Sequence, residues 1–423
     1  MTPGEQRGAG HGLLVLLTLM NVLNFVDRQL LSSFANFIVP DLSLTNTEFG
    51  LLTGLVFIVF YAVAGLFMGA LADMVNRPRL IAGAMFAWSA LTAASGLARN
   101  FVTLAIPRVF IGVGESALTP TAMSLLADRY PLEKRGFAAG FYYMGVPIGV
   151  GVSLLVAGFL GPAIGWRNCF FLLGAIGVVF SLIIFQVKET RAVRTEATKA
   201  ASPKLGELLR IFGAALAASP ALQLTIAGGV VVHFLLGAAA FDQLWLVRER
   251  GFERAEIAVI SGLIACAAGV AGNLFGGVAS DRWVTATGQS RPMFMVWVLL
   301  ALLPINLAYR LIDPGNAMFW VCMVVAYFQL GAFYGPTFST VQELCPSQVR
   351  STVVAFYIMS LNVIGLGIGI TGSGVLVDAL IARGVEQPYS WTLFAFTCLS
   401  AFAIPCYFAA ARMCAPRVAP ANT

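Results

Sequence analysis

The chain has 423 residues, of which 59% are hydrophobic and only 11% are charged, against about 25% charged residues in an ordinary soluble domain. So much apolar surface excludes a soluble fold and predicts an all-α membrane protein that crosses the bilayer many times. The net charge of +6 does not indicate a nucleic-acid partner, because basic residues on cytoplasmic loops produce the same sign.

Apolar stretches recur along the whole chain, and at about 20 residues for each span the length has room for twelve. The first six fall at 12–37, 49–72, 80–98, 102–127, 136–160 and 168–187. The second six fall at 221–247, 256–280, 292–312, 316–343, 351–378 and 389–411. We expect twelve transmembrane helices in two bundles of six, at 1–187 and 221–423, joined by a polar linker at 188–220.

The positions of the 26 Lys and Arg residues predict the orientation. Most of them lie at the two ends, in the linker and on the even-numbered loops, so the positive-inside rule places both termini and the linker in the cytoplasm. The first apolar stretch has no small-residue cleavage site and is not expected to be a signal peptide. The seven cysteines are scattered and never spaced as CxxC, so we expect no metal site and no disulfide. We also expect a monomer without a cofactor.

The two halves of the chain resemble each other. VDRQLL (26–31) and FDQLWL (241–246) align Asp27 with Asp242 at a spacing of 215, and YYMGVPIGVG (142–151) aligns with IMSLNVIGLG (358–367) at 216. Asp73 and Asp281, each in a loop that follows the second helix of its half, are 208 positions apart. These matches predict a duplicated six-helix unit, an architecture of transporters whose substrate site lies near the bilayer midplane between the halves.

Helix 1 carries two adjacent charges in NFVDRQLLSSF (24–34). Each charge near a helix centre costs about 2.5–3.5 kcal/mol on insertion scales, so such residues are expected to line an aqueous cavity or to meet a partner. Neighbouring side chains on a helix point about 100° apart. We therefore expect Asp27, with Asn24 on the same face, to look toward the cavity, and Arg28 to look toward a neighbouring helix or its polar boundary.

Helix 4 carries a second charged set in PRVFIGVGESALTP (107–120). Arg108 and Glu115 are two turns apart on one face, about 10 Å along the axis, and Gly112 between them leaves space for a neighbouring backbone or a ligand. A permanent cation beside acids that can take up a proton is what proton coupling needs, with Arg108 pairing with Asp27 or Glu115. The alternative is a static polar network that fixes helix packing.

Helix 7 contributes two further candidates for substrate binding, His233 and Asp242. A lone intramembrane histidine is more often structural, and Asp242 lies close enough to the helix end to be simply solvated. With Asn24, Arg28 and Arg108 they complete the expected substrate-binding set.

Two stretches are candidates for gating. In GALADMVNRPR (69–79), Gly69 permits close packing, Asp73 can meet a basic group or a helix N-terminus, and Arg77 holds the inside surface; Asp281 belongs to the half-matching copy. The alternative is an ordinary basic loop. In helix 5, GVPIG combines the glycines of a flexible helix with Pro147, and the alternative is a kink used only in packing. The residues of this motif are Gly145, Pro147 and Gly149.

These motifs resemble the major facilitator superfamily. GALADMVNRPR is similar to its loop between helices 2 and 3, although Asn76 stands where a glycine is usual, and RVFIGVG and GVPIG are similar to its helix 4 and helix 5 motifs. NFVDR with RVFIGVGES and LLADRYP resembles the spinster-like branch, including its bacterial members. The resemblance covers essentially the whole chain and implies a location in the cell inner membrane.

The resemblance also implies a function: proton-linked movement of lysophospholipids, sphingosine phosphates or similar lipids with one tail. It maps proton sensing onto Asp27 and Glu115 and a partner role onto Arg108. A symporter of small organic anions or sugar acids is the alternative, because related branches also carry a DR pair in helix 1. A membrane enzyme is disfavoured by the lack of any catalytic set or HEXXH spacing, and a lipid-sensing receptor is left open.

Overall fold

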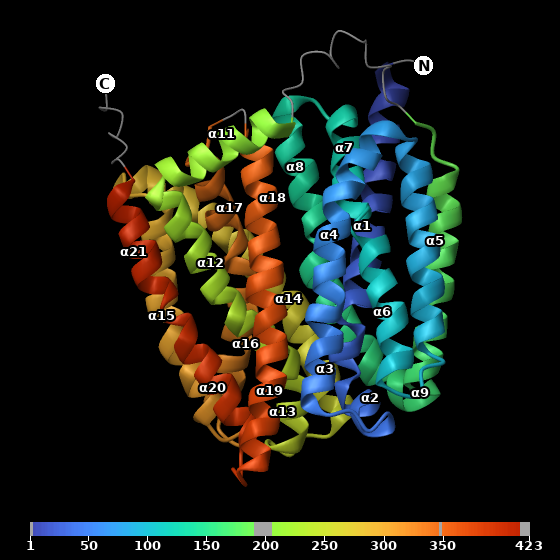
Figure 1. Cartoon of the computed structure of the whole chain (residues 1–423), viewed down its shortest axis with the longest axis vertical. Helices are drawn as coiled ribbons and strands as arrows, with labels where there is room; N and C mark the ends of the chain where they lie inside the picture. Colours follow the sequence, from blue (N-terminus) through green and yellow to red (C-terminus); the bar gives the residue numbers. More distant parts are fainter. Residues whose placement is uncertain (1–2, 190–204, 347–348, 415–423) are drawn as a thin grey trace. The chain divides into compact units, whose positions relative to one another are not determined.

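The computed structural model describes residues 3–189, 205–346 and 349–414, and in these ranges every regular element is a helix (Figure 1). A few side chains inside the helices, that of Asp73 among them, lie outside the described part. Most of the predicted linker, at 190–204, also lies outside it, while its end forms the amphipathic helix α11 (Leu205–Ala218).

The chain divides into two compact units. Unit 1 comprises Met1–Arg194 and Leu246–Cys266, and unit 2 comprises Thr195–Trp245 and Ala267–Thr423. The segment Leu246–Cys266 thus groups with unit 1, whereas the predicted bundle boundaries assign it to the second half. Those boundaries remain a prediction.

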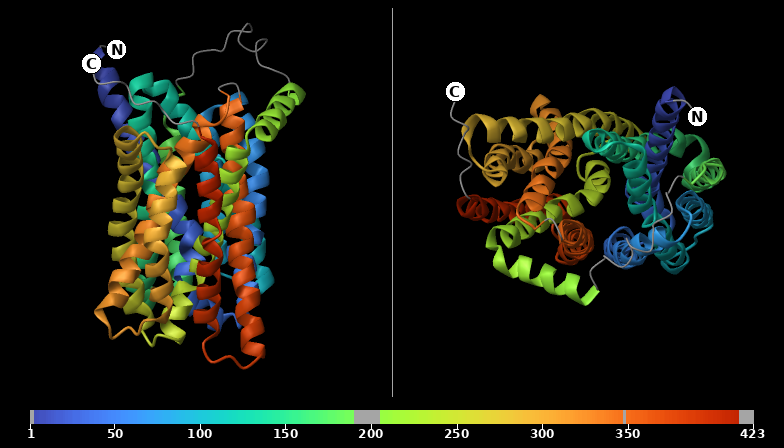
Figure 2. Two further views of the ribbon diagram at one scale, coloured as in Figure 1. Left: turned by 90° about the vertical axis from the view of Figure 1, so that its left-hand side faces the viewer. Right: turned by 90° about the horizontal axis from the view of Figure 1, so that it is seen from above.

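In unit 1, long helices lie side by side, and two views at right angles show the same arrangement (Figures 1 and 2). The helices are α1 (Pro3–Ser33), α2 (Ala35–Asp41), α3 (Asn46–Thr53), α4 (Leu55–Met74), α5 (Arg77–Ser95), α6 (Phe101–Glu115), α7 (Leu118–Arg129), α8 (Leu132–Tyr143) and α9 (Gly145–Phe185). Because α1 and α5 both pack extensively on α9, and α6 packs on α4 and α5, the charged stretches of α1 and α6 point into protein rather than lipid.

Unit 2 repeats the plan with other helices. They are α12 (Pro220–Ala238), the 3₁₀ turn η1 (Ala239–Phe241), α13 (Asp242–Arg248), α14 (Arg254–Thr287), α15 (Arg291–Leu311), α16 (Ala317–Ala332), α17 (Tyr334–Glu343), α18 (Arg350–Met359), the π-helix η3 (Ser360–Gly367), α19 (Ile368–Ala382), α20 (Pro388–Ser400) and α21 (Ala403–Met413). α13 and α14 are divided between the two units. Large apolar and aromatic side chains fill the core of unit 2, including the fully buried Val353 and Tyr357.

Ten stretches among the described residues are long and apolar enough to cross a membrane. One of them, Lys134–Phe185, has 52 residues and is broken at Gly165, whose φ is 78°, so it makes two passes. The shorter α5 packs along α6 and α9 and supplies a further pass. The predicted all-helical fold is confirmed, and the ten stretches are consistent with twelve spans.

The local sequence explains several helix ends. Thr45 and Glu48 form a capping box at α3, and Asn100 and Thr103 form one at α6. Asn76, which stands where a glycine is usual, caps α5 by accepting a hydrogen bond from the Arg79 N–H. The substitution therefore suits the start of the helix.

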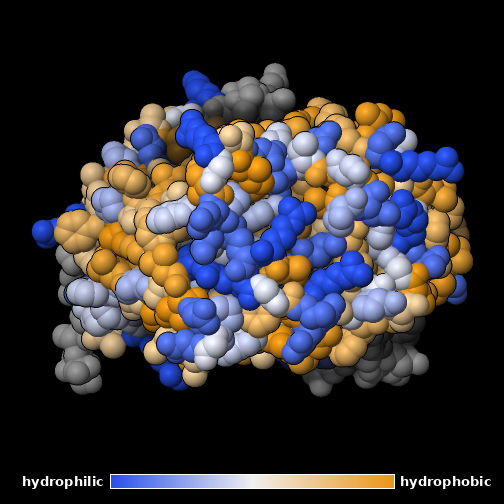
Figure 3. Space-filling view, turned by 90° about the horizontal axis from the view of Figure 1, so that it is seen from below, coloured by the Kyte–Doolittle hydropathy of each residue, from blue (hydrophilic) through white to orange (hydrophobic). Residues whose placement is uncertain are grey.

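The ends of the helices carry the polar surface. Figure 3 shows hydrophilic side chains in the middle of the lower end face and hydrophobic side chains toward its edges. Many large apolar side chains on the helix flanks are also exposed, for example Phe67 at 69% and Phe159 at 62%. This is the pattern of a protein whose flanks meet lipid.

Candidate functional site

The charged residues predicted inside the membrane come together in unit 1. We call this group the intramembrane cluster; it consists of Asn24, Asp27 and Arg28 of α1 and Arg108 and Glu115 of α6. Asp27 and Glu115 are only 2% and 1% exposed, and Arg108 is 4% exposed. A charged side chain that faced lipid would be costly. Burial within the protein lets this span region contain several charged side chains without exposing them to lipid.

Arg28 makes the ion pair of the cluster. Its Nε donates to Oε2 of Glu115 at 3.4 Å. The guanidinium also lies 4.3 Å from the centre of the Tyr61 ring and 4.9 Å from that of Phe25. Arg28 therefore points toward the neighbouring helices α6 and α4, as the sequence predicts, and its charge is stabilised by one carboxylate and by aromatic faces.

Arg108 does not bind a carboxylate in this structure. Its Nη2 donates to the carbonyl of Arg28 at 2.8 Å and its Nη1 to the carbonyl of Asp27 at 3.3 Å, and the guanidinium lies 4.5 Å from the centre of the Phe57 ring. The sequence predicts a pairing of Arg108 with the Asp27 or Glu115 side chain. The structure instead attaches this arginine to the backbone of α1, and Arg28 takes Glu115.

Asp27 is the least satisfied member of the cluster. Among the described residues, neither of its carboxyl oxygens has a partner that meets the geometric criteria for a hydrogen bond, although the Trp88 indole lies close enough to interact with it. Oε1 of Glu115 also lacks such a partner. Asp27 lies within electrostatic reach of both Glu115 and Arg108. A buried carboxyl group without a well-formed hydrogen bond needs a cation, a donor or a proton, so this group is suited to respond when any of these arrives.

Glycines set the spacing around the cluster. A Cβ at Gly112 would lie 2.8 Å from the Phe57 carbonyl oxygen of α4, which confirms the expected close approach of a neighbouring backbone. A Cβ at Gly149 would lie 2.5 Å from Cβ of Phe25, and one at Gly145 would lie 2.9 Å from Nδ2 of Asn21. Gly145 and Gly149 thus let α9 approach α1 one turn from Asn24 and Asp27.

Pro147 lies just after the junction of α8 and α9 at Met144, whose φ of −60° and ψ of −22° are helical. The proline removes one backbone hydrogen bond, but the helix continues through the junction. The close approach of Gly145 and Gly149 to α1 gives this motif a packing role.

His233 of α12 lies in the core of unit 2 and is 1% exposed. Its Nδ1 lies 2.8 Å from the Gly229 carbonyl and its Nε2 lies 3.4 Å from the Tyr334 hydroxyl. A Cβ at Gly365 of the π-helix would lie 2.3 Å from Cβ of His233. The ring is wedged between Tyr334 and a glycine of an irregular helix, an arrangement that a structural histidine would also show.

Asp242 is not simply solvated, which corrects one of the two interpretations of the sequence. Its Oδ1 accepts a hydrogen bond from Nη1 of Arg310 at 2.8 Å, and its side chain is 15% exposed. Arg310 is 3% exposed and lies 4.8 Å from the centre of the Trp245 ring. The sequence analysis did not single out Arg310, because it stands at the end of a span where a loop charge is expected.

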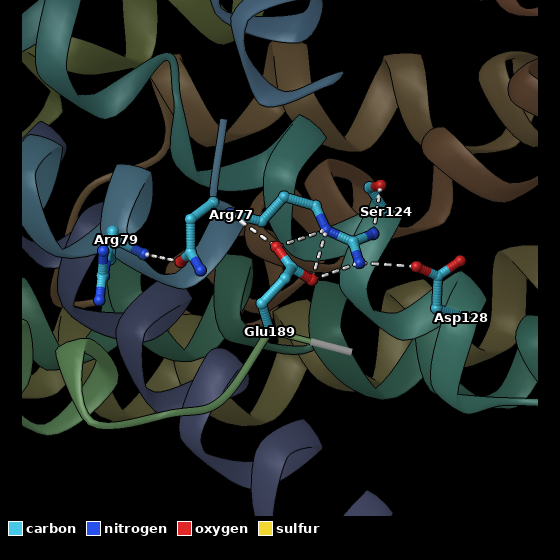
Figure 4. Close-up of polar contacts among 6 residues, drawn as sticks. Arg77, Arg79, Ser124, Asp128 and Glu189 are labelled. Atoms are coloured by element: carbon cyan, nitrogen blue, oxygen red, sulfur yellow. Dashed lines mark hydrogen bonds and ion pairs between the residues drawn. The ribbon is translucent and has the colours of Figure 1, made fainter. Parts of the chain in front are cut away.

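A second polar group of unit 1 surrounds Arg77 at the start of α5; we call it the α5 ion-pair cluster (Figure 4). Arg77 is 1% exposed and donates through Nη2 to Glu189 and to Asp128, both at 2.7 Å. Its Nη1 donates to the Ser124 hydroxyl at 2.9 Å. The loop therefore does more than carry positive charge, because Arg77 fastens α5 to the end of α7 and to the segment after α9.

A Cβ at Gly69 would meet no described atom within 4 Å, so the close packing expected there is not found. The same holds for Gly277 of α14, which stands 208 positions later, as Asp281 does from Asp73. A Cβ at the adjacent Gly276, in contrast, would lie 2.4 Å from the Ala332 carbonyl oxygen. The predicted role of Asp73 cannot be compared, because its side chain lies outside the described residues.

Asp281 belongs to an ion-pair cluster of unit 2 centred on Arg291 at the start of α15. Nη2 of Arg291 donates to Oδ1 of Asp281 at 2.6 Å, and Nη1 contacts Glu343 at the end of α17. The sequence contained a signal for this cluster. Arg77 and Arg291 are 214 positions apart, and Asp128 and Glu343 are 215 apart, the same offset that aligns Asp27 with Asp242.

The described residues contain no group of three or more His, Cys, Asp or Glu side chains that could hold a metal ion. What the structure does assemble is a set of buried acids and arginines on adjacent helices, with ion-pair clusters at the helix ends. Such an arrangement can bind an anion, exchange protons and change ion-pair partners as helices move.

Comparisons with known proteins identify the family of the chain. The sequence model of the Major Facilitator Superfamily matches residues 17–370. An MFS-type efflux pump of Mycolicibacterium smegmatis is 28% identical over 374 residues, which are 86% of this chain and 84% of the relative. A hexuronate transporter of Bacillus subtilis is 26% identical, over 86% of this chain and 87% of the relative.

Among solved structures, the chain is similar to a bacterial homologue of the human lysosomal transporter Spinster, in an inward-facing and unoccupied conformation. The TM-score is 0.80 at 25% sequence identity, and the match covers 95% of this chain and 97% of that one.

Proposed function

Because the chain belongs to the Major Facilitator Superfamily, it is a multi-pass secondary transporter and not an enzyme, and we propose that it couples protons to the movement of an amphipathic lipid. The proposed cargo has a charged head and one long tail, as in a lysophospholipid or a sphingosine phosphate. The observation that carries the proton coupling is the burial of Asp27 beside Glu115 and Arg108, with only the Trp88 indole as a nearby donor and no well-formed hydrogen bond among the described residues.

In this proposal Asp27 and Glu115 bind and release the proton. Glu115 is held by Arg28 at 3.4 Å through one oxygen only, and Arg108 reaches the two carbonyls that flank Asp27 in α1. When α1 and α6 shift, Arg108 can exchange a carbonyl for an acidic side chain, and a protonated carboxyl group that gains this cation releases its proton and becomes a carboxylate. Coupling then follows from a change of partner rather than from a fixed network.

The cargo is proposed to bind at the polar residues predicted for it: Asn24, Arg28, Arg108, His233 and Asp242. Arg28 and Arg108 are suited to a phosphate or carboxylate head, since a guanidinium binds either with two parallel hydrogen bonds. Asp242 takes part only when its bond to Arg310 opens. The similarity to a probable sphingolipid transporter of Arabidopsis thaliana, 25% identical over 67% of this chain and 64% of that relative, supports a lipid as cargo.

Gating is proposed for two regions. The α5 ion-pair cluster and the Arg291 group would lock and release the helix ends through Asp73, Arg77 and Asp281, with Gly69 in an open position that leaves α4 room to move. The helix would bend at the junction of α8 and α9, at Gly145, Pro147 and Gly149. The bias of basic residues supports a cell inner membrane location with cytoplasmic termini.

The test is transport by the purified protein in liposomes with an imposed pH gradient. Asp27→Asn and Glu115→Gln should abolish gradient-driven uptake of a labelled lysophospholipid, while the exposed Glu386→Gln should transport like the unmodified chain. Circular dichroism and elution volume confirm that each variant folds. Gradient-driven uptake that survives in Asp27→Asn would refute the assigned role of this residue.

A symporter of small organic anions or sugar acids is the second candidate. The full-length similarity to a hexuronate transporter favours it, and two buried arginines suit a carboxylate equally well. Thermal stabilisation of the purified protein separates the two: lysophospholipids should raise the melting temperature and glucuronate should not. Stabilisation by glucuronate alone would replace the lipid with a sugar acid and leave the proton-coupling proposal intact.

A further inference from the structure

Unit 1 carries an open groove of about 470 Å³ whose lining residues come from α4, α5 and α6. α6 packs on both α4 and α5, whereas α4 and α5 contact each other much less, so the groove separates these two helices and α6 forms its floor. Its volume is within the range of about 300–1,000 Å³ that small-molecule sites occupy. Asp27 and Glu115 are not among its lining residues, so it is distinct from the intramembrane cluster.

Small residues create this groove. Gly83, Ala84 and Ala87 line it on α5, and Gly114 lines it on α6. A Cβ at Gly83 would meet no atom within 4 Å, so the space above this face of α5 is open. Within a membrane, such a space is filled by lipid, because neither water nor a vacuum is favourable against an apolar wall.

The groove has the length of one lipid chain. Its α5 face runs from Arg79 to Leu91, and this stretch of helix rises about 18 Å. The hydrocarbon core of a bilayer is about 30 Å thick, so the groove covers slightly more than one leaflet. A chain lying in it would start at the end of α5 that carries Arg79 and would end near the bilayer midplane.

Arg79 is the only charged residue among those that line the groove. It is exposed, and its guanidinium lies 5.8 Å from the centre of the Phe185 ring. Figure 4 shows it apart from the contacts made by Arg77. Among the described side chains, this places a cation without an ion-pair partner at the headgroup end of an apolar channel.

We propose that this groove is a binding site for a membrane phospholipid with an anionic head, whose phosphate meets Arg79 and whose acyl chain lies on Gly83, Ala87 and Gly114. Arginine binds phosphate through strong charge-assisted hydrogen bonds, and a net anionic head complements a lone cation better than a zwitterionic one. This lipid is a resident of the outer surface of unit 1 and not the transported cargo. The proposal therefore does not depend on the proposed function.

The site has a structural consequence. Arg79 is two residues from Arg77, the centre of the α5 ion-pair cluster, and both belong to the first turn of α5. A lipid that bridges α4 and α5 through the groove would brace the same helix end that Arg77 fastens from the inner side. Lipid and ion pairs would thus hold opposite faces of one helix terminus.

Native mass spectrometry of the purified protein, with phosphatidylglycerol or phosphatidylcholine added, tests the site. The unmodified chain should retain one phosphatidylglycerol in preference to phosphatidylcholine. Arg79→Gln should weaken phosphatidylglycerol binding about tenfold or more, as expected for the loss of a charged hydrogen bond, and Arg79→Lys should keep part of the preference. Gly83→Leu, which fills the groove, should displace both lipids.

Matched controls use positions outside the groove. Gly136→Leu changes a glycine of α8 that is also exposed and also has no atom near its Cβ, and Arg282→Gln removes an exposed cation of α14. Both should bind like the unmodified chain, as should Asp27→Asn. If only Arg79→Gln weakens phosphatidylglycerol binding, the lipid is attracted to the surface charge and does not occupy the groove. If only Gly83→Leu weakens it, Arg79 does not bind the headgroup. If neither variant weakens it, the proposal is wrong.

Discussion

The two units bury acids in opposite ways. In unit 2, Asp242 is bound to the Arg310 guanidinium at 2.8 Å. In unit 1, Asp27 has no well-formed hydrogen bond among the described residues, although Arg108 lies beside it and donates to backbone carbonyls instead. The two aspartates align in the sequence repeat, 215 residues apart, but Asp27 lies inside the continuous α1 and Asp242 begins α13 after a 3₁₀ turn, so both their partners and their helical setting differ.

This comparison shows how one duplicated unit can serve two purposes. A closed acid–arginine pair fixes helices, because opening it exposes two charges to an apolar core. A carboxyl group whose hydrogen-bonding capacity is unfilled can take a proton or a cation without breaking an existing bond. The capacity for proton exchange is therefore concentrated in unit 1, while the corresponding pair in unit 2 holds α13 against α15.

The largest expected effect breaks the closed pair. Asp242→Asn removes the carboxylate to which Arg310 is bonded, and the loss of one partner of a buried ion pair costs about 3–5 kcal/mol of unfolding free energy. Asp27→Asn removes no described hydrogen bond and should leave that free energy nearly unchanged. Denaturant titration of both variants in detergent measures the difference; equal losses would show that the two aspartates are bound alike.

The ion-pair clusters at the helix ends give the next largest difference. Arg77 is 1% exposed, whereas the side chain of Arg291 is 12% exposed and one of its acids, Asp281, is 68% exposed. Arg77→Gln should lower the unfolding free energy by about 1.5–3 kcal/mol, and Arg291→Gln by about 1 kcal/mol or less. Added salt should weaken only the second effect. A larger loss in Arg291→Gln would reverse this ranking.

The smallest effect is expected at Gly69 of α4, in contrast to the closely packed Gly276 of α14. Gly276→Ala places a methyl group 2.4 Å from the Ala332 carbonyl oxygen and should cost about 1–3 kcal/mol. Gly69→Ala has open space and should be neutral or slightly stabilising, by about 0.5–1 kcal/mol, because alanine is the better helix former. Thermal melting of the two variants decides between them. Destabilisation by Gly69→Ala would mean that α4 packs more closely than the structure shows.

Much of the fold follows from the sequence. The spans can be predicted from hydropathy, and the two halves from matching motifs that lie 208 to 216 positions apart. The membership of Asp27, Arg28, Arg108 and Glu115 in one cluster is also readable, since intramembrane charges must meet each other. Their pairing is not. Helical spacing fixes the face of a side chain but not how far a long arginine reaches. The sequence predicts that Arg108 pairs with Asp27 or Glu115, whereas in the structure Arg108 binds backbone carbonyls and Arg28 binds Glu115.

The contacts that the sequence did not reveal join residues far apart in the chain. Arg310 and Asp242 are 68 positions apart, and Arg291 and Glu343 are 52 apart. Each of these arginines stands at the end of a helix, where a loop charge needs no explanation. The repeat offset would have identified the Arg291 pair from the Arg77 pair, but no such counterpart exists for Arg310, whose partner is known only from the packing of α13 on α15.

The π-helical turn at Ser360–Gly367 changes the directions in which the side chains of one span point. Each α-helical residue advances the side-chain direction by about 100°, and a π-bulge accommodates extra chain within a helix. Because the π-helical turn changes the rotation per residue, α18 and α19 do not follow one helical wheel. A single wheel drawn through both helices gives the wrong direction for the side chains of α19, Ser373 among them. The side-chain directions in this span therefore need two separate helical wheels, one for α18 and one for α19, with the change at the π-helical turn that packs against His233.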